Sequence, residues 1–354
     1  MVPGTGWKAA VTTPRLRVLG IHGSPYSRKL LAALRYRRLP YAWIVRDSPE
    51  DSGLPRPKVF LLPQLIGEDA GGEPVAITDS TPMLRDLDRR FPGREVRPTD
   101  RVLALVDSIL EDWADEWLTK AMFHYRWAFA DDIRRATGIL PRWSQPSRPD
   151  EAVKFGGGMF GQRQIDRLGV VGSNATTAPI IEDSYRRTLA LLSAHLEGSR
   201  FLMGARPGAS DFAVYGQLTQ LVGFDPTPTA IAYETAPRVV AWVNVVEELS
   251  GLEPVGGDWV ARDAIPATLL ALLAEVGRVY VPFLLANAAA VAAGSERVEC
   301  TIDGRAWTQK PFPYQAKCLG WLREEYAALS ADERADADRI LGGSGCEALF
   351  AEPN

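Results

Sequence analysis

A strand pattern that runs directly into a helix pattern is the feature that most restricts the fold of this chain. Residues 15–21 carry the apolar pattern of a buried strand, and 24–38 carry apolar residues at helical spacing. At the junction, Ser24 is a favoured N-cap residue and Pro25 a favoured first helical residue. The sequence Ser-Pro-Tyr-Ser of residues 24–27 is therefore expected at one end of a sheet, at the start of a helix.

The rest of the first hundred residues continues this alternation. Short apolar runs predict strands at Tyr41–Val45, Val59–Ile66 and Val75–Thr78. Asp79 or Ser80 then caps a helix that ends near Phe91, before Pro92-Gly93. A β-α-β unit followed by a hairpin and a helix predicts an α/β, thioredoxin-like domain over residues 15–98.

Pro63 lies inside the third predicted strand, where it cannot donate a hydrogen bond to the ladder. A cis Leu62–Pro63 bond would turn the amide and carbonyl groups of Leu62 outward. Such bonds are uncommon and usually serve a specific geometry. The sequence leaves the cis and trans forms equally open.

From Thr99 onward the pattern is helical. The sequence predicts one long helix over 101–135 and a long connection or lid over 138–178, where Gly156-Gly157-Gly158 occurs. Further helices are expected at Ile180–Leu196, Ser210–Val222, Pro237–Ser250, 266–293 and Tyr314–Leu329, with a hairpin at Val298–Thr308 that turns at Asp303-Gly304. We divide the chain into a tail (1–14), the thioredoxin-like domain (15–98), an all-helical domain (99–250) and a mostly helical C-terminal extension (251–354).

Composition excludes several functions. The net charge of −4 leaves no surplus of basic residues to neutralise phosphates, so we expect no nucleic-acid partner. The cysteines are Cys300, Cys318 and Cys346, without CxxC spacing, which fits a reducing, cytoplasmic location. The three histidines lack metal-ligand spacing, so no metal is expected.

No membrane partner is expected either. The N-terminal residues Met1–Pro14 lack the apolar core of a secretion signal. The most lipid-like stretch, Val279–Ala293, is shorter than the roughly 20 residues that a bilayer requires. Pro282 and Asn287 interrupt it, so a buried helix is the better interpretation.

Residues 15–250, about two thirds of the chain, resemble a cytosolic glutathione transferase of the bacterial serine type. Three segments carry the resemblance: Gly23–Leu30 resembles the loop and helix start, Leu62–Leu65 the strand with a cis proline, and Asp79–Leu84 the acidic-Ser pair that binds the γ-glutamyl end of glutathione. A fourth segment, Gly204–Asp211, resembles the capping box of the helical domain but has Gly208 where the capping hydroxyl belongs.

The resemblance implies an enzyme that activates glutathione, its co-substrate, for attack on a small hydrophobic electrophile by conjugation, ether cleavage or isomerisation. Ser24 would donate a hydrogen bond to the glutathione thiolate, with Tyr26 and Ser27 as competitors for that contact. Further glutathione contacts are implied for Tyr26, Leu62, Pro63, Asp79 and Ser80. The implied electrophile pocket is lined by Trp113, Trp117 and Tyr125, and the implied assembly is a homodimer.

Each of these assignments has an alternative. Ser24, and Asp79 with Ser80, are ordinary N-caps if no ligand binds. The aromatic residues near Glu111–Trp117 fit a helix packed in the core or at a dimer interface equally well. At the level of function, the alternatives are a non-catalytic transferase-like scaffold and a glutathione-dependent thiol reductase. The reductase needs a late cysteine near the site, because residues 24 and 27 are serines.

Overall fold

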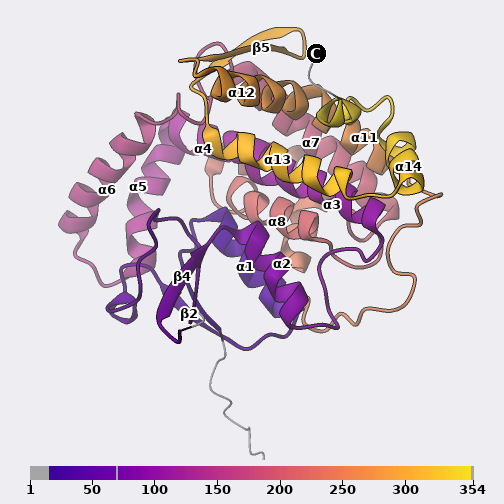
Figure 1. Cartoon of the computed structure of the whole chain (residues 1–354). Helices are drawn as coiled ribbons and strands as arrows, with labels where there is room; N and C mark the ends of the chain where they lie inside the picture. The colour runs from indigo at the N-terminus through magenta and orange to yellow at the C-terminus, as the bar shows by residue number, and fades with distance from the viewer. Residues whose placement is uncertain (1–15, 69–70, 352–354) are drawn as a thin grey trace, which may run out of the picture.

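The computed structural model describes residues 16–68 and 71–351 (Figure 1). The predicted tail 1–14 and the predicted first strand residue, Arg15, lie outside them. The N-terminal part consists of β1 (Leu16–Gly20), α1 (Pro25–Tyr36), β2 (Tyr41–Val45), the 3₁₀ turn η1 (Pro49–Asp51), β3 (Gln64–Glu68), β4 (Pro74–Thr78) and α2 (Ser80–Arg90). The sheet order is β2-β1-β3-β4, with β1 parallel to β2 and the other pairs antiparallel. The predicted thioredoxin-like fold is confirmed.

The third strand is shorter than predicted. It begins at Gln64, directly after Pro63, and Val59–Leu61 form an exposed loop rather than a strand. The reason is that Pro63 has no N–H group for the ladder, so strand pairing starts one residue later. The Leu62–Pro63 bond is cis, which answers the question that the sequence left open.

The all-helical domain is also confirmed, with corrections to its elements. It contains α3 (Arg101–Trp113), the π-helical segment η2 (Ala114–Leu118), α4 (Thr119–Ala128), α5 (Ala130–Ser144), α6 (Asp150–Ile165), α7 (Ala178–Gly198), α8 (Ala209–Leu221), α9 (Pro226–Thr235) and α10 (Pro237–Val246). The single helix predicted over 101–135 is wrong, because Phe129 has an extended backbone (φ −110°, ψ 134°) that separates α4 from α5. Helix α9 was not predicted.

The prediction of a long connection over 138–178 is wrong as well, since α5 extends to Ser144 and α6 follows. The glycines that argued against a helix are needed for its packing. A Cβ atom at Gly157 would lie 2.2 Å from the Thr137 carbonyl oxygen, and one at Gly161 would lie 2.5 Å from Thr137 Cγ2. Two glycines one helical turn apart therefore let α6 approach α5 closely, and this tertiary contact outweighs their poor helix propensity.

The start of α8 replaces the missing capping hydroxyl with a side chain from another helix. Asp211 is buried and accepts hydrogen bonds from the backbone N–H groups of Gly208 (2.8 Å) and Leu202 (2.9 Å). Asp107 of α3 accepts from the N–H group of Ser210 (3.2 Å). A Cβ atom at Gly208 would lie 2.3 Å from Asp107 Oδ1, so glycine makes room for this substitute cap.

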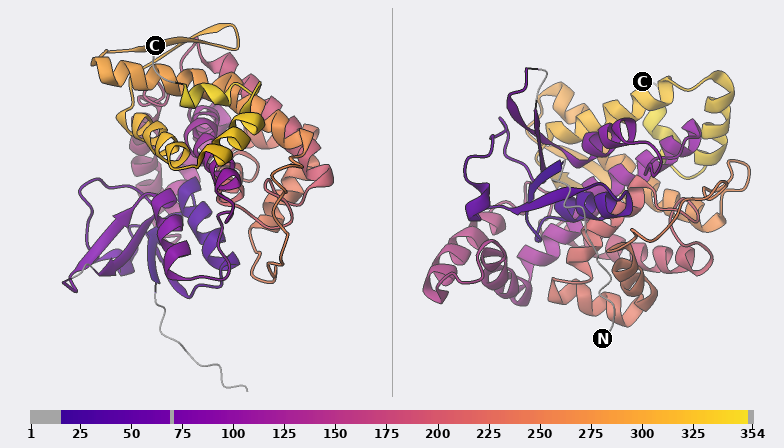
Figure 2. Two further views of the ribbon diagram at one scale, coloured as in Figure 1. Left: turned by 45° about the vertical axis from the view of Figure 1, so that its right-hand side comes forward. Right: turned by 90° about the horizontal axis from the view of Figure 1, so that it is seen from below.

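The extension is helical with one hairpin, as predicted. It contains α11 (Ala267–Glu275), the π-helical segment η3 (Val276–Tyr280), α12 (Val281–Ala293), β5 (Val298–Ile302), β6 (Arg305–Gln309), α13 (Pro313–Ala327), α14 (Ala331–Leu341) and the 3₁₀ segment η4 (Cys346–Phe350). Figure 2 shows this orange-to-yellow part of the chain against one side of the helical domain, where α13 and α14 contact α3.

The apolar helix predicted over 266–293 is confirmed, and the lipid-like stretch Val279–Ala293 is only its second half. Helix Ala267–Ala293 is continuous over 27 residues, because η3 joins α11 to α12. By length and composition alone it could cross a membrane, so the argument from shortness was wrong. However, 61% of its apolar window is buried inside the protein, as in the core helix of a soluble domain.

One hydrophobic core runs through all three parts of the chain. It includes Val18 and Leu30 of the thioredoxin-like part, Trp113 and Tyr185 of the helical domain, and Leu272 of the extension. All five side chains are fully buried. A smaller cluster on the opposite face of the sheet contains Leu19, Ile44, Leu54 and Ile66. The extension is therefore part of the central core.

Candidate functional site

The sheet register brings the three transferase-like segments to one edge. Leu19, near the end of β1, pairs with Gln64, and Gln64 also pairs with Thr78 at the end of β4. The loop that follows β1, the cis Leu62–Pro63 bond that precedes β3, and Asp79 that follows β4 therefore adjoin the same edge of the sheet. Segments far apart in the sequence thus form one candidate site.

Of the three hydroxyl groups in the 24–27 loop, the structure leaves that of Ser24 best placed to donate. Ser24 is the N-cap of α1, and its half-buried Oγ accepts from the Ser27 N–H group at 3.2 Å. Ser27 is fully buried, and its Oγ accepts from the Ile21 N–H group at 3.4 Å. The Tyr26 hydroxyl donates to the Asp115 carbonyl oxygen of the helical domain at 2.8 Å, so its proton is already used in a hydrogen bond within the protein.

The carbonyl groups that precede Ser24 are held by buried side chains of the helical domain. Arg126 of α4 donates to the Gly23 carbonyl oxygen at 3.1 Å, and Gln220 of α8 donates to the His22 carbonyl oxygen at 3.1 Å. Arg126 also donates to Gln220 (2.8 Å) and forms a buried ion pair with Asp225 (2.9 Å). This network holds the loop at residues 22–24 against the helical domain. Sequence analysis did not predict it.

Asp79 has an unusual backbone conformation and an unexpected partner. Its φ of +80° is rarely adopted by residues other than glycine, and such strain gathers at functional sites. One carboxylate oxygen accepts from the Thr81 N–H group (3.3 Å), which makes Asp79 the N-cap of α2. The other accepts from the Tyr314 hydroxyl of the extension (2.6 Å). Ser80 beside it is 4% exposed.

The aromatic residues predicted to line the electrophile pocket are core residues. Trp113, Trp117 and Tyr125 are between 0% and 2% exposed, and the Trp117 indole donates to Ser184 at 2.8 Å. These three residues therefore fit the alternative interpretation, an aromatic helix packed in the core. A side chain without exposed surface cannot contact a ligand that enters from solvent.

Other aromatic side chains surround the loop instead. A Cβ atom at Gly23 would lie 2.8 Å from the ring of Trp143, and a Cβ atom at Gly20 would lie 2.4 Å from the ring of Trp43. The His22 ring is close to both tryptophans, with its centroid 5.8 Å from that of Trp43 and 6.1 Å from that of Trp143. All three side chains are half-buried. Burial lowers the pKa of His22, which keeps the ring neutral at neutral pH.

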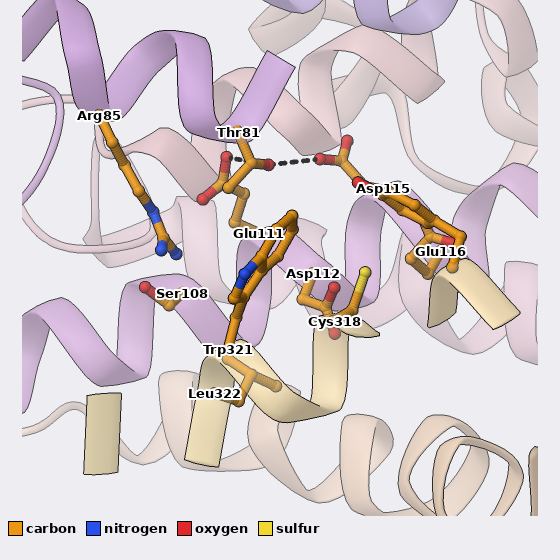
Figure 3. A pocket seen from close by; sticks show the side chains of 11 residues that line it. Thr81, Arg85, Ser108, Glu111, Asp112, Asp115, Glu116, Cys318, Trp321 and Leu322 are labelled. Carbon is orange, nitrogen blue, oxygen red and sulfur yellow. Dashed lines mark hydrogen bonds between the residues drawn. The ribbon is translucent and has the colours of Figure 1, made fainter. Parts of the chain in front are cut away.

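A buried acidic cluster lies beneath α13, next to the start of α2 (Figure 3). Its carboxyl groups belong to Glu111, Asp112, Asp115 and Glu116, the acidic run that stands out in the sequence. They line a cavity of about 20 Å³, which suits one water-sized group. Lys29 of α1 is fully buried and pairs with Glu111 (2.6 Å) and Asp115 (2.5 Å).

Burial changes the acidity of this cluster. It raises the pKa of Asp112 to about 7 and that of Glu116 to about 8, with further increases from the neighbouring carboxylates. Burial also acts on Glu111, but the charges of Lys29 and Arg85 and the hydrogen bonds from Lys29 and Thr81 together outweigh it and lower the pKa of Glu111. Near neutral pH, Glu116 is therefore largely protonated and Asp112 is partly protonated. Among residues 16–68 and 71–351, no group of three or more His, Cys, Asp or Glu side chains is arranged to hold a metal ion.

The cysteines are poor candidates for thiol chemistry. Burial raises the pKa of Cys300 to about 11 and that of Cys346 to about 12. Cys318 lines the cavity beneath α13 and is 4% exposed, and burial raises its pKa strongly. All three are therefore thiols, not thiolates, at neutral pH.

Sequence analysis missed two further contacts of the site. Lys29 could have been noticed as a lysine on an otherwise apolar helix face, complementary to the acidic run at 111–116. The contact of Tyr314 with Asp79 had no local signal, since 235 residues separate them.

Two segments of the chain match family models. Residues 18–95 match the glutathione S-transferase N-terminal domain, and residues 162–244 match the glutathione S-transferase C-terminal domain. These matches support the glutathione S-transferase superfamily. The site at the sheet edge lies within the first segment, except for the contacts from the helical domain and the extension.

Solved structures of two glutathione transferase family members and of a β-etherase resemble the chain only in part. A family member from Pseudomonas fluorescens with two glutathione bound is 16% identical, covering 66% of this chain and 92% of its own, with a TM-score of 0.39. The β-etherase LigF from Sphingobium sp. strain SYK-6 is 19% identical, with coverages of 65% and 94% and a TM-score of 0.45. A glutathione S-transferase from Methylobacterium radiotolerans in complex with glutathione sulfonate is 17% identical, with coverages of 70% and 98% and a TM-score of 0.39.

Because these TM-scores are all below 0.5, the structural similarity assigns neither a reaction nor a substrate to this chain. No curated protein matches the sequence significantly.

Proposed function

We propose that the protein is a serine-type glutathione transferase that binds glutathione at the sheet edge and activates its thiol. The observation that carries the proposal is the convergence of Ser24, the cis Leu62–Pro63 bond and Asp79-Ser80 at one edge of a thioredoxin-like sheet. The two matched transferase domains support it.

Ser24 would act on the glutathione sulfur. Its Oγ accepts from the Ser27 N–H group, and its own proton can be donated to a thiolate at the N-terminus of α1. A hydrogen bond to a charged group contributes roughly 1.5–3 kcal/mol, which lowers a thiol pKa by about one to two units. The helix N-terminus adds up to about 1 kcal/mol. Bound glutathione would then be largely thiolate, the nucleophilic form.

Asp79 and Ser80 would bind the γ-glutamyl end. The Asp79 carboxylate suits the α-ammonium group, and the Ser80 hydroxyl with the first N–H groups of α2 suits the α-carboxylate. In the reaction, the thiolate sulfur forms a bond to a carbon of a small hydrophobic electrophile while the bond from that carbon to its leaving group breaks, and the leaving group departs with the electron pair. We place that electrophile against the half-buried rings of Trp43 and Trp143, beside the loop.

A second candidate function, a transferase-like scaffold without catalysis, is favoured by one observation. The Tyr314 hydroxyl already bonds to the Asp79 carboxylate that glutathione would need. The thiol reductase alternative has less support, because residues 24 and 27 are serines and the three cysteines are held as thiols.

Calorimetric titration of glutathione into the wild type and Ser80→Ala tests the proposal. We expect binding by the wild type and weakening of about tenfold in Ser80→Ala, the loss of roughly 1.4 kcal/mol. Ser295→Ala, at an exposed position of the extension, is the matched control and should bind as the wild type does. Absence of binding by the wild type at millimolar glutathione would reject the enzyme and favour the scaffold.

The remaining features of the proposal follow from the resemblance. We propose a cytoplasmic homodimer, and the exposed apolar side chains of Val59, Phe60 and Leu61 (65%, 38% and 47% exposed) are candidates for its interface. Sedimentation of the wild type and of Val59→Ser with Leu61→Ser measures this. A monomeric wild type would contradict the dimer.

A further inference from the structure

The C-terminal extension reaches the proposed glutathione site through one side chain. Tyr314, in the first turn of α13, donates its hydroxyl proton to Asp79 Oδ2 at 2.6 Å. Asp79 Oδ1 accepts from the Thr81 N–H group, so each of the two oxygens accepts one hydrogen bond. A carboxylate offers about four acceptor positions, and two are therefore left for a ligand.

The position of Tyr314 is itself fixed by a buried polar residue. Asn287 lies in the apolar helix α12 and is 0% exposed. Its side chain accepts from the Phe312 N–H group (2.8 Å) and donates to the Phe312 carbonyl oxygen (3.0 Å). One residue after Tyr314, Gln315 donates to Glu116 of the helical domain at 2.9 Å. These contacts anchor the backbone on both sides of Tyr314.

The surroundings keep Tyr314 a donor. Burial, together with the neighbouring Cys318 and Asp79, raises the pKa of the Tyr314 phenol. It therefore stays protonated at all physiological pH values and presents its hydrogen to the Asp79 carboxylate. The ring packs edge-on against Trp321 of the same helix, with centroids 6.3 Å apart, so it is restricted from turning away.

We propose that Tyr314 is a positioning residue of the glutathione site, which orients the Asp79 carboxylate toward the α-ammonium group of the γ-glutamyl moiety. The extension then contributes one wall of the site, and the strained backbone of Asp79 is held by contacts on both carboxylate oxygens. This inference rests on the proposed function, since it names how the same site recognises glutathione.

The test compares two ligands by calorimetry in the full-length protein. One is glutathione, and the other is deamino-glutathione, which lacks the α-ammonium group. We expect Tyr314→Phe to weaken glutathione about tenfold and to leave deamino-glutathione within about twofold. Tyr326→Phe is the matched control, because Tyr326 lies on the same helix but donates to Asp338 (2.8 Å), away from the site.

A double mutant makes the test independent of any loss of structure. In an Asp79→Asn background, Tyr314→Phe should cause no further weakening of glutathione, because the carboxylate it orients is gone. Equal affinity of wild type and Tyr314→Phe for glutathione would overturn the inference, as would equal weakening of both ligands. Tighter binding by Tyr314→Phe would also overturn it and identify Tyr314 as a competitor of the ligand. Failure of the wild type to bind glutathione would instead reject the proposed function.

Discussion

Ser24, Tyr26 and Ser27 look interchangeable as sulfur donors in the sequence, and their surroundings separate them. The Tyr26 hydroxyl donates to the helical domain, and Ser27 is fully buried under the loop. Ser24 is half-buried, and its hydroxyl has only an incoming hydrogen bond among those of the described residues. A difference in burial, which a sequence does not show, thus decides between adjacent hydroxyls.

We expect Ser24→Ala to raise the pKa of bound glutathione. Loss of a hydrogen bond to a charged sulfur removes roughly 1.5–3 kcal/mol, so the thiol pKa should rise by about one to two units. Ultraviolet titration of the thiolate in the glutathione complex measures this shift. Ser27→Ala is the control, since it should affect stability but not the thiol pKa. The opposite pattern, a shift in Ser27→Ala alone, would assign the sulfur contact to Ser27.

At the scale of elements, the network that joins α4 and α8 to the loop after β1 leads to a second prediction. Arg126→Lys keeps the charge but loses the fork that contacts Gly23, Gln220 and Asp225 together. We expect the free energy of unfolding to fall by about 1–3 kcal/mol. The pKa of bound glutathione should also rise, because the Ser24 loop loses its support.

Urea unfolding and the same thiolate titration measure these two effects. The matched control is Arg134→Lys on α5, which is exposed and pairs with nearby Asp131 (2.8 Å). A stability loss without any change in the thiol pKa would show that Arg126 supports the fold but does not position Ser24.

The contact between α13 and the η2 segment predicts a pH dependence of stability. Burial raises the pKa of Glu116 from an ordinary value near 4.5 to about 8. The folded state therefore binds a proton that the unfolded state has lost, and stability falls as pH rises between these values. Glu116→Gln cannot ionise, and its carbonyl can still accept from Gln315. Its stability should fall less steeply with pH, by up to about 1.4 kcal/mol per pH unit.

Urea unfolding at several pH values between 4.5 and 8 tests this expectation. Glu116→Gln should be more stable than the wild type at pH 8, and the two should converge toward pH 4.5. Glu151→Gln on the exposed face of α6 is the control and should follow the wild type. Parallel curves for Glu116→Gln and the wild type would show that Glu116 is ionised in the folded protein.

Elements with strong local patterns could be predicted from the sequence. The strand Tyr41–Val45 is where its pattern placed it, and the hairpin turns at Asp303-Gly304, where both residues have positive φ (51° and 73°). Helix α6 could not be predicted, because its glycines have meaning only against Thr137 of α5. The surroundings of the aromatic residues near Trp113 could not be predicted either. Their periodicity shows which face of the helix is buried but not which elements cover that face.

The candidate site was predicted in part for a similar reason. Asp79 and Ser24 occur in short motifs that are readable locally. Lys29, Arg126 and Tyr314 act through partners 82 to 235 residues away. Such contacts depend on how the domains and the extension pack, which no local pattern in one sequence encodes.

At the scale of the whole molecule, the shared core predicts that the extension and the thioredoxin-like part unfold together. Leu272 of α11 is 0% exposed and belongs to the same cluster as Val18 of β1. Leu272→Ala should lower the free energy of unfolding by about 2–5 kcal/mol, the usual cost of a large-to-small core change. Because the core is continuous, amides of β1 should lose as much protection as amides of the extension.

Native-state hydrogen exchange of the wild type and Leu272→Ala measures protection in both parts. Leu270→Ala, two residues away on the same helix but 38% exposed, is the matched control and should change protection little. Loss of protection confined to α11–α14 would mean that the extension opens on its own while β1 stays folded. In that case the Tyr314 side chain would lose its contact with Asp79 whenever the extension opened. If Tyr314 is a permanent part of the glutathione site, β1 and α11 must therefore unfold together.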